Sequence, residues 1–307
     1  MAVHTSGKVV AANYLVDLVR HGVPFEAIYS VPAGYAVRIA PQQDQVEVSR
    51  YGTVHDRSVS AAASLDDIAR DIRTELELWL SRLAAQFSQR KICICLSGGL
   101  DSGLIAALAR KYCGNLTAYT YTFTGAGVAA SEDAVYAERL ARILKIPFRL
   151  VTATEDDLHE AVDAALCYGQ DWRDFNVHCA IVNDIVARAI RQDAGTSGTP
   201  LPLVLTGDLA NEFLADYEPV AYGGEEYYKL PRMEPFDLRR TLIRGLDSGD
   251  REVGVFSRHG LDVIQPYGLI VNQYHRLSPA FIGGKQSKQA LAQKVAGDLL
   301  PAFLFNR

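Results

Sequence analysis

The chain has 307 residues, of which 49% are hydrophobic and 22% charged, and its formal net charge is −5. This composition is typical of a globular protein with one large domain or two unequal ones. The acidic balance gives no general attraction to nucleic acid or to an anionic membrane, and no apolar run approaches the length of about 18 residues that a membrane span requires. We therefore expect neither nucleic acid nor a membrane as a partner.

The start of the chain, residues 1–8, lacks the basic and then apolar layout of a signal peptide. The five cysteines are an odd number, and we expect them to be small buried residues in a reduced cytoplasm. Cys93 and Cys95 lie in a predicted strand, where we expect them on opposite faces and unbridged. The expected location of the protein is therefore cytoplasmic.

Residues 1–60 are predicted to form a short β-rich segment. Leu15–Val19 has the pattern of a short helix. Ala36–Ala40 and Val46–Tyr51 alternate in polarity around a four-residue turn, which predicts a β-hairpin. The polar and small residues at 55–63 predict a linker.

From residue 61 onward, predicted helices and strands alternate. Ser64 is a predicted N-cap, and acidic residues follow it in the first turn of a helix that we expect to end near Phe87. Helices are also expected between four apolar strands, at Ile92–Leu96, Leu116–Phe123, Pro147–Val151 and Leu203–Leu205. This order predicts an α/β fold: a parallel sheet with helices on both faces, a ligand site at the carboxyl ends of its strands, and a mostly helical part over residues 218–307.

The first strand is followed at once by Ser97-Gly-Gly-Leu-Asp-Ser102 and then by a helical pattern. Two adjacent glycines let the backbone approach a ligand, and successive N–H groups before a helix N-terminus favour an anion. Ser97 and Ser102 add hydroxyl donors, and Asp101 adds a carboxylate that magnesium can bridge to phosphate. The loop lacks the lysine of a P-loop, which indicates chemistry other than γ-phosphoryl transfer.

This hexapeptide resembles the pyrophosphate-binding signature of the ATP pyrophosphatases, which cleave ATP between the α- and β-phosphates. Together with Thr206–Tyr217 it resembles the asparagine synthetase family, whose second motif runs roughly Ser-Gly-Glu-Gly-Ala-Asp-Glu-Leu-Phe-Gly-Gly-Tyr. The pairs Asp250-Arg251 and Leu300-Pro301, and the segments beginning at His259, Gln265 and Lys288, are similar to further segments of that family. The resemblance covers about residues 28–307.

The resemblance implies an adenine nucleotide α-hydrolase-like fold, ATP and Mg²⁺ as cofactors, and an AMP-forming ligase. A substrate carboxylate attacks the α-phosphorus of ATP, pyrophosphate leaves, and ammonia or an amine displaces AMP. Asp101 and Asn211 are the implied metal ligands. Asp208 is the implied base, and Glu212 is a second implied catalytic residue beside it. Lys288 is the implied lysine that stabilises phosphate, and Lys285 is the alternative residue for that role. The implied ATP-binding residues are Leu96, Ser97, Gly98, Gly99, Leu100, Asp101, Ser102, Phe123 and Gly207, among which Leu96, Phe123 and Gly207 frame the adenine.

Two departures from the family pattern affect the expected function. The family's glutaminase domain begins with a catalytic cysteine, whereas position 2 is Ala2 and the first cysteine is Cys93. We therefore expect no glutamine hydrolysis, with residues 1–60 a remnant of the glutaminase domain and 61–307 the ATP pyrophosphatase domain. Asn211 stands where the family has an aspartate, and a neutral amide is a weaker ligand for magnesium.

The sequence leaves several alternatives open. The fold also suits a thiolation or RNA-modifying ATP pyrophosphatase, and Asn211 suits a catalytically impaired partner subunit that binds nucleotide. Residues 170–178 are either part of the acceptor site or a capped amphipathic helix, and Glu225–Tyr228 either lines the mouth of the pocket or forms a solvated loop. A further hypothesis is self-association into a homodimer through residues 28–51. Neither the carboxylate nor the amine is identified.

Overall fold

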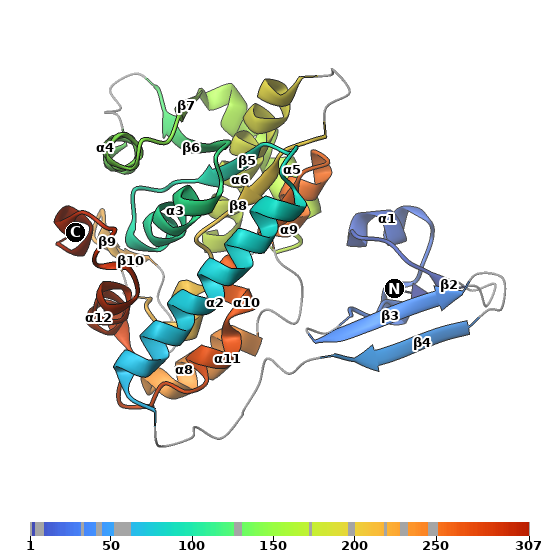
Figure 1. Cartoon of the computed structure of the whole chain (residues 1–307). Helices are drawn as coiled ribbons and strands as arrows, with labels where there is room; N and C mark the ends of the chain where they lie inside the picture. Colours follow the sequence, from blue (N-terminus) through green and yellow to red (C-terminus); the bar gives the residue numbers. More distant parts are fainter. Residues whose placement is uncertain are drawn as a thin grey trace.

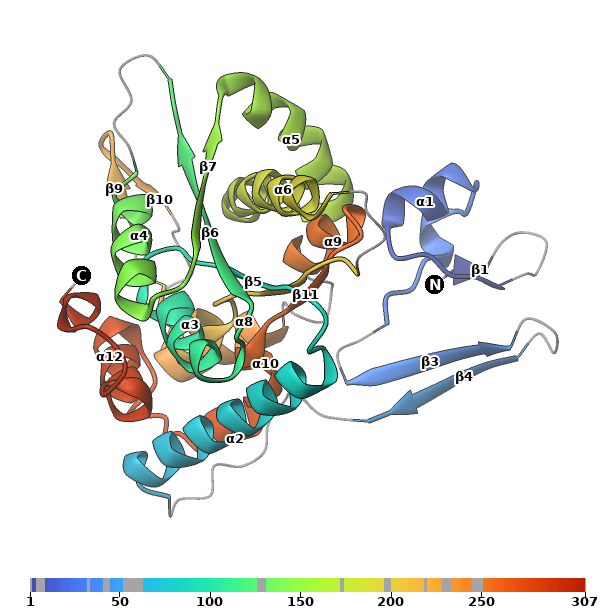
Figure 2. The same ribbon diagram turned by 45° about the horizontal axis from the view of Figure 1, so that its top comes forward.

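The computed structural model describes residues 2–3, 9–31, 34–40, 45–51, 63–125, 131–171, 174–195, 200–217, 220–227, 233–244 and 251–306. Its centre is a five-stranded sheet in the order β11-β8-β5-β6-β7, with every neighbouring pair parallel (Figures 1 and 2). The strands are β5 (Ile92–Cys95), β6 (Leu116–Phe123), β7 (Phe148–Ala153), β8 (Leu203–Leu205) and β11 (Asp262–Ile264). The parallel sheet predicted from the sequence is therefore confirmed.

The central strand β5 is buried on both faces. Ile92 and Ile94 belong to the large core cluster on one side, whereas Cys93 and Cys95 belong to the smaller cluster on the other. The expectation that the two cysteines face opposite sides was wrong, because residues i and i+2 of a strand point to the same face. All five cysteines of the chain are unbridged. Cys93 and Cys113 are buried, whereas Cys95, Cys167 and Cys179 are partly exposed, which corrects the expectation that all five are buried.

Helices cover both faces of the sheet (Figure 2). On one face lie α2 (Leu65–Gln86), α3 (Leu100–Tyr112), α4 (Glu132–Leu144) and α12 (Gly284–Ala296). On the other lie α5 (Glu155–Gly169), α6 (Asp174–Ala194) and α9 (Arg251–Arg258). Ser64 caps α2 by accepting a hydrogen bond from the Asp67 N–H, as its position predicts.

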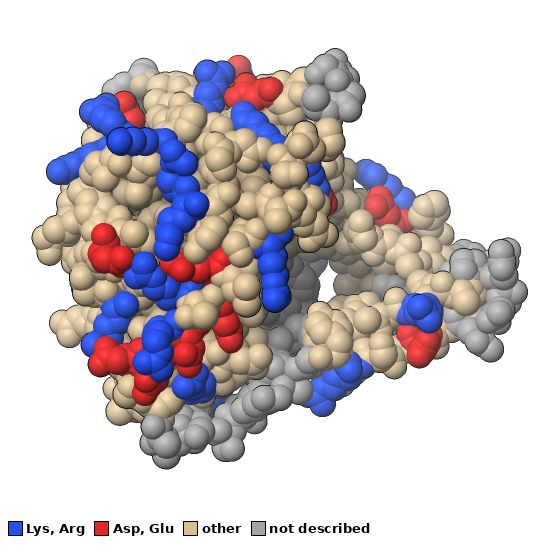
Figure 3. Space-filling model, in the orientation of Figure 1, with Lys and Arg blue, Asp and Glu red and all other residues tan. Residues whose placement is uncertain are grey.

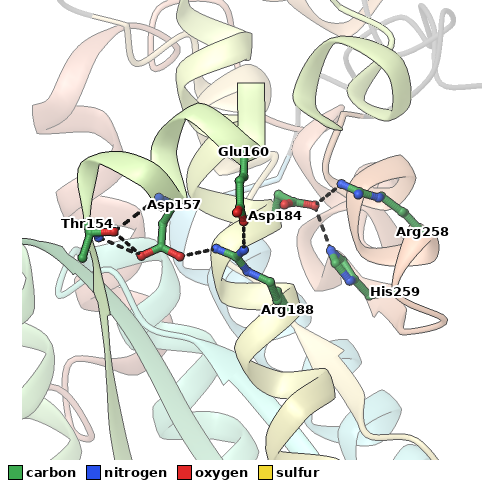
Figure 4. Close-up of polar contacts among 7 residues, drawn as sticks. All are labelled: Thr154, Asp157, Glu160, Asp184, Arg188, Arg258 and His259. Atoms are coloured by element: carbon green, nitrogen blue, oxygen red, sulfur yellow. Dashed lines mark hydrogen bonds and ion pairs between the residues drawn. The ribbon is translucent and has the colours of Figure 1, made fainter. Parts of the chain in front are cut away.

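Two polar networks, one centred on Arg188 and the other on Asp184, join the helices of the second face (Figure 4). Arg188 on α6 contacts Asp157 and Glu160 on α5, both at 2.7 Å. Asp184 on α6 is buried and accepts from Arg258 at 3.1 Å and lies 2.8 Å from His259 Nε2. These contacts fix α9 against α6, and α9 begins with two residues of the candidate site.

The chain after residue 218 is mostly helical, as expected, with α8 (Pro235–Arg244), α10 (Pro266–Leu269), α11 (Val271–Tyr274), α12 and the 3₁₀ turn η3 (Ala302–Phe305). It also contributes β11 to the main sheet and a small hairpin of β9 (Val220–Tyr222) and β10 (Glu225–Tyr227). Glu225 to Tyr227 are therefore a strand, which corrects the expected loop. Gly284 begins α12.

The N-terminal segment lies beside the sheet domain (Figures 1 and 2). It contains β1 (Ala2–Val3), β2 (Val9–Val10), α1 (Leu15–Arg20), the 3₁₀ turn η1 (Phe25–Ala27) and the expected hairpin, β3 (Tyr35–Ala40) with β4 (Gln45–Arg50). Tyr14 joins it to the sheet domain, because its hydroxyl donates to the Gly254 carbonyl at 2.8 Å and its ring meets Tyr168 edge-on. Most of the predicted linker at 55–63, namely residues 55–62, lies outside the described residues.

Charged side chains of both signs are interspersed around α2 on the face in Figure 3. Several of them form ion pairs there, among them Arg73 with Asp298 at 2.6 Å and Lys111 with Glu77 at 2.6 Å. Over the described part of the chain, no helix combines the length and the apolar character that crossing a membrane demands.

Candidate active site

The loop between β5 and α3 is held in one shape by a glycine and two serines. Gly98 has φ +71°, and a Cβ there would lie 2.5 Å from the Asp133 carbonyl oxygen, so a larger residue is both strained and obstructed. The Ser97 N–H donates to Ser102 Oγ at 3.1 Å, and the two hydroxyl oxygens are 3.0 Å apart. Both hydroxyls therefore lie together at the start of α3, where the helix dipole favours an anion.

A second loop, after β8, touches the first one. A Cβ at Gly207 would lie 2.5 Å from the Ser102 backbone nitrogen and 3.0 Å from the Asp101 carbonyl carbon. The absence of a side chain at Gly207 therefore allows the two loops to meet. The short helix α7 (Ala210–Leu214) follows and carries Asn211 and Glu212.

The second loop contains two residues in the left-handed region that are not glycine. Leu209 has φ +80° and Ala215 has φ +53°. The family motif given above has glycine at both positions, and glycine adopts such angles without steric cost. In this chain each costs on the order of 1–3 kcal/mol, which the surrounding packing must offset; Leu209 and Ala215 are both buried.

Lys288 on α12 joins the two loops. Its Nζ lies 3.0 Å from Asp101 Oδ2, 2.6 Å from Asn211 Oδ1 and 2.5 Å from Asp216 Oδ2. Burial alone would lower the pKa of the Lys288 ammonium, but the two carboxylates raise it above its ordinary value. Burial raises the pKa of Asp101, and the neighbouring Lys288 partly opposes this rise.

A second set of contacts surrounds the predicted base. Arg251 at the start of α9 lies 3.3 Å from Asp208 Oδ2. The next residue, Glu252, is buried and accepts from Thr206 Oγ1 at 2.8 Å and from Gln265 Nε2 at 2.9 Å. The residues that follow β8 and begin α9 are therefore connected to each other through hydrogen bonds.

These loops surround a cavity of about 490 Å³ at the carboxyl ends of the strands. Of the residues predicted from sequence, eight line it: Leu96, Ser97, Asp101, Ser102, Gly207, Asp208, Asn211 and Glu212. Gly98, Gly99, Leu100, Phe123 and Lys288 are not among its lining residues. Phe123 is therefore not brought to the cavity wall, and Lys288 reaches the cavity only through its contacts with Asp101 and Asn211.

Sequence reasoning missed the opposite wall. Tyr119 and Tyr121 of β6 and Cys179 and Asn183 of α6 line it, together with Val182 and Val186. The sequence pattern does not distinguish these residues, because alternate residues of a strand and the polar face of a helix occur in ordinary packing as well. Tyr217 also lines the cavity and donates to Glu212 Oε1 at 2.6 Å.

The segment proposed for the acceptor does not line this cavity in its described part. The Gln170 side chain instead binds the N-terminal segment, accepting from the Leu15 N–H at 2.8 Å and donating to the Asn13 carbonyl at 3.3 Å. His178 is exposed. Residues 172–173 and the side chain of Lys285 lie outside the described part of the structure.

Among the described residues, no group of three or more His, Cys, Asp or Glu side chains is arranged to hold a metal ion. Magnesium, however, is commonly held by one or two carboxylates together with the phosphates of a nucleotide. Asp101 supplies one such carboxylate on the cavity wall at the phosphate-binding loop. The donor set therefore fits a magnesium ion that a nucleotide brings with it.

A sequence model of the asparagine synthase family matches residues 81–252, more than half of the chain. A putative glutamine-hydrolysing asparagine synthetase of Methanocaldococcus jannaschii is 32% identical over 123 residues, which are 40% of this chain and 18% of that protein. The chain thus matches less than a fifth of that relative's length.

Two solved structures are similar to this one at low TM-scores. A glutamine-dependent NAD⁺ synthetase from Acinetobacter baumannii in complex with ADP gives a TM-score of 0.35 at 15% identity, over 57% of this chain and 30% of that one. An NMN synthetase from Francisella tularensis gives 0.32 at 18% identity, over 67% of this chain and 92% of that one.

Proposed function

This chain belongs to the asparagine synthase family, and we propose that it is an ATP-dependent, AMP-forming carbon–nitrogen ligase. It adenylates a substrate carboxylate, releases pyrophosphate and transfers the acyl group to ammonia or to an amine. The observation that carries this proposal is the meeting of the two motif loops around one cavity: Gly207 touches Ser102, and Lys288 contacts both Asp101 and Asn211.

The first loop would bind the β- and γ-phosphates of ATP. Ser97, Ser102 and the N-terminus of α3 supply hydroxyl and N–H donors of the kind that stabilise charge on a departing pyrophosphate. Asp101 would hold magnesium together with these phosphates, with Asn211 as a weaker second ligand. When bound, the ion would neutralise part of the phosphate charge.

The second loop would serve the amine. Asp208 lines the cavity and carries the carboxylate that accepts a proton from the attacking nitrogen. Its contact with Arg251 at 3.3 Å orients it. Glu212 lines the same wall, where its hydrogen bond with Tyr217 fixes its position, and it supports the amine site.

We propose that the nitrogen does not come from glutamine hydrolysis by this chain. Glutamine hydrolysis in the family needs a nucleophilic cysteine, and a reactive thiol has a lowered pKa. Burial instead raises the pKa of four of the five thiols, those of Cys93, Cys95, Cys113 and Cys179. The same shifts disfavour a thiolation enzyme that works through a reactive cysteine.

The division of the chain is part of the proposal. Residues 61–307 form the ligase domain, and residues 1–60 are a glutaminase remnant docked through Tyr14 and Gln170. The hairpin β3–β4 lies within this remnant. Magnesium dependence, a cytoplasmic location and a homodimer belong to the same hypothesis.

Phosphorus NMR of the nucleotide products tests the proposed function. The protein is incubated with ATP, Mg²⁺, ammonium and a panel of carboxylic acids, and glutamine replaces ammonium in a parallel series. We expect a carboxylate substrate alone to permit adenylation, and sustained formation of AMP and pyrophosphate to require ammonium or a free amine as well. ADP and phosphate as products would contradict α–β cleavage, and ATP binding without turnover would favour the impaired partner subunit.

A further inference from the structure

The ammonium group of Lys288 has three acceptors around it. A protonated lysine has three N–H donors, and Asp101, Asn211 and Asp216 lie 3.0, 2.6 and 2.5 Å from its nitrogen. The side chains of Lys288 and Asp216 are 14% and 9% exposed. The ammonium is therefore fully coordinated by this chain's own side chains at the edge of the cavity.

The two residues that contact Lys288 from the second loop differ from the family motif in opposite ways. The motif has aspartate where this chain has Asn211, and glycine where this chain has Asp216. One carboxylate is thus lost and another gained five positions along the same segment. Because both side chains contact the same nitrogen atom, the number of carboxylates around Lys288 stays the same.

Local backbone geometry supports this shift of the charge. Ala215 has φ +53°, which turns the chain after α7, and the Asp216 N–H returns to the Asn211 carbonyl at 3.0 Å. This turn places residues 211 and 216 next to each other. The Asp216 side chain can therefore reach the position that a side chain at 211 also reaches.

The three acceptors are not equivalent. The Asp101 and Asp216 carboxylates carry a negative charge that attracts the ammonium, whereas the Asn211 amide is neutral, so the amide is the weakest acceptor. Asn211 also lines the cavity, whereas Asp216 does not. An entering phosphate oxygen would therefore displace the Asn211 amide and leave Lys288 held by Asp101 and Asp216.

We propose that Asp216 is a positioning residue. It supplies the negative charge that is missing at residue 211, and it holds the Lys288 ammonium so that a phosphate oxygen can take the place of the Asn211 amide. The inference rests on the proposed function, because it concerns the departure of pyrophosphate. It assigns Asp216 no contact with the substrate.

Steady-state kinetics of AMP formation and calorimetric binding of inorganic pyrophosphate test this role. The variants are Asp216→Asn, Asn211→Asp/Asp216→Asn, and Asp66→Asn as a matched control. Asp66 also pairs with a lysine of α12, Lys294, at 2.5 Å, but it is exposed. Circular dichroism melting identifies any variant that does not fold.

We expect Asp216→Asn to lower kcat at least about 10-fold, because the ammonium loses its fixed position. Pyrophosphate affinity should not fall, since a negative charge near the anion has been removed. The double variant, which places the carboxylate at 211 instead, should recover most of the lost kcat, and Asp66→Asn should match wild type. This difference between kcat and binding separates a positioning role from a general loss of structure.

Unchanged kcat in Asp216→Asn, or a double variant no better than the single one, would overturn the inference while the proposed function stands. If the single variant does not fold, the double variant decides: it supports the inference if it folds and turns over, and contradicts it otherwise. Absence of AMP formation by wild type would instead refute the proposed function, and the inference with it.

Discussion

Gly207 lies so close to Ser102 that a Cβ on the glycine would stand 2.5 Å from the serine backbone nitrogen. Gly207 belongs to the loop after β8, whereas Ser102 lies in the first turn of α3. Their contact fixes the spacing between the phosphate-binding loop and the loop that carries the predicted base. The cavity therefore depends on residue 207 having no side chain.

Gly207→Ala should weaken ATP binding and lower the free energy of unfolding by about 1–3 kcal/mol, the usual cost of an inserted methyl in a packed site. The obstructing atoms belong to the backbone, so no side chain can rotate away. Isothermal calorimetry with ATP and chemical denaturation measure the two effects. Gly114→Ala is the control, because a Cβ at Gly114 meets nothing within 4 Å; equal effects in both variants would contradict the prediction.

Lys288→Met should reduce AMP formation on the order of 100-fold, as loss of one donor to a developing charge does. It should also destabilise the fold by about 3–5 kcal/mol, because two carboxylates lose their shared cation. Lys294→Met removes a lysine from the same helix at an exposed position and should retain full turnover. Initial rates at saturating ATP, measured below the melting temperature of each variant, compare the two; similar rates would exclude the assigned role for Lys288.

Asp208→Asn should separate the two half-reactions. The amide cannot accept a proton from the amine, so amide formation should fall about 10²- to 10⁴-fold. Adenylation does not need that proton acceptor and should continue. Exchange of labelled pyrophosphate into ATP measures the first step and product formation the second; a variant that loses both equally would show that Asp208 acts in binding or adenylation instead.

Local signals account for most of the fold. Ser64 before α2 and the alternating hairpin strands were read correctly because caps and strand alternation depend on neighbours in sequence. Strand β11 was missed, since three residues, Asp262–Ile264, carry little pattern of their own. They form a strand because they pair with β8, which lies about 60 residues earlier in the chain.

Likewise, one part of the candidate site could be predicted from local sequence signals, and the other part depends on how distant segments pack. The motif loops were found because each follows a strand in the sequence, and Gly207 was selected by its motif rather than by its contact with Ser102. The contact of Lys288 with Asp216 joins segments about 70 residues apart and depends on how α12 packs. The wall formed by Tyr119 and Cys179 arises from packing of α6 on β6, which no local pattern records.

Tyr14→Ala should loosen the N-terminal segment. This substitution removes the hydrogen bond to the Gly254 carbonyl and the edge-on contact with Tyr168. Limited proteolysis of the full chain should then cleave residues 1–60 faster and leave the larger fragment intact. Tyr29→Ala changes an exposed tyrosine of the same segment and serves as the control; equal cleavage of wild type and Tyr14→Ala would contradict the proposed docking contact.

Asp157 should make the stability of the chain depend on pH. Hydrogen bonds from the Thr154 backbone N–H and hydroxyl, followed by the ion pair with Arg188, lower the pKa of Asp157 below its ordinary value of 3.8 (Figure 4). A carboxylate with a lowered pKa stabilises the folded state at pH values above 3.8. This contribution is lost as the pH falls through the lower, folded-state pKa.

Asp157→Asn should therefore lower the free energy of unfolding by about 1 kcal/mol at pH 7, the usual value of a helix cap. The difference from wild type should shrink as the pH falls below 3.8 towards the lower, folded-state pKa, because the wild-type carboxyl group then begins to take up a proton. Urea denaturation at pH 7, 5 and 3 measures it. Asp156→Asn removes an acid from the same first turn without touching the capping box, so its effect should be smaller; a wild-type advantage over Asp157→Asn that stays constant down to pH 3 would show that the charge of Asp157 does not stabilise the helix.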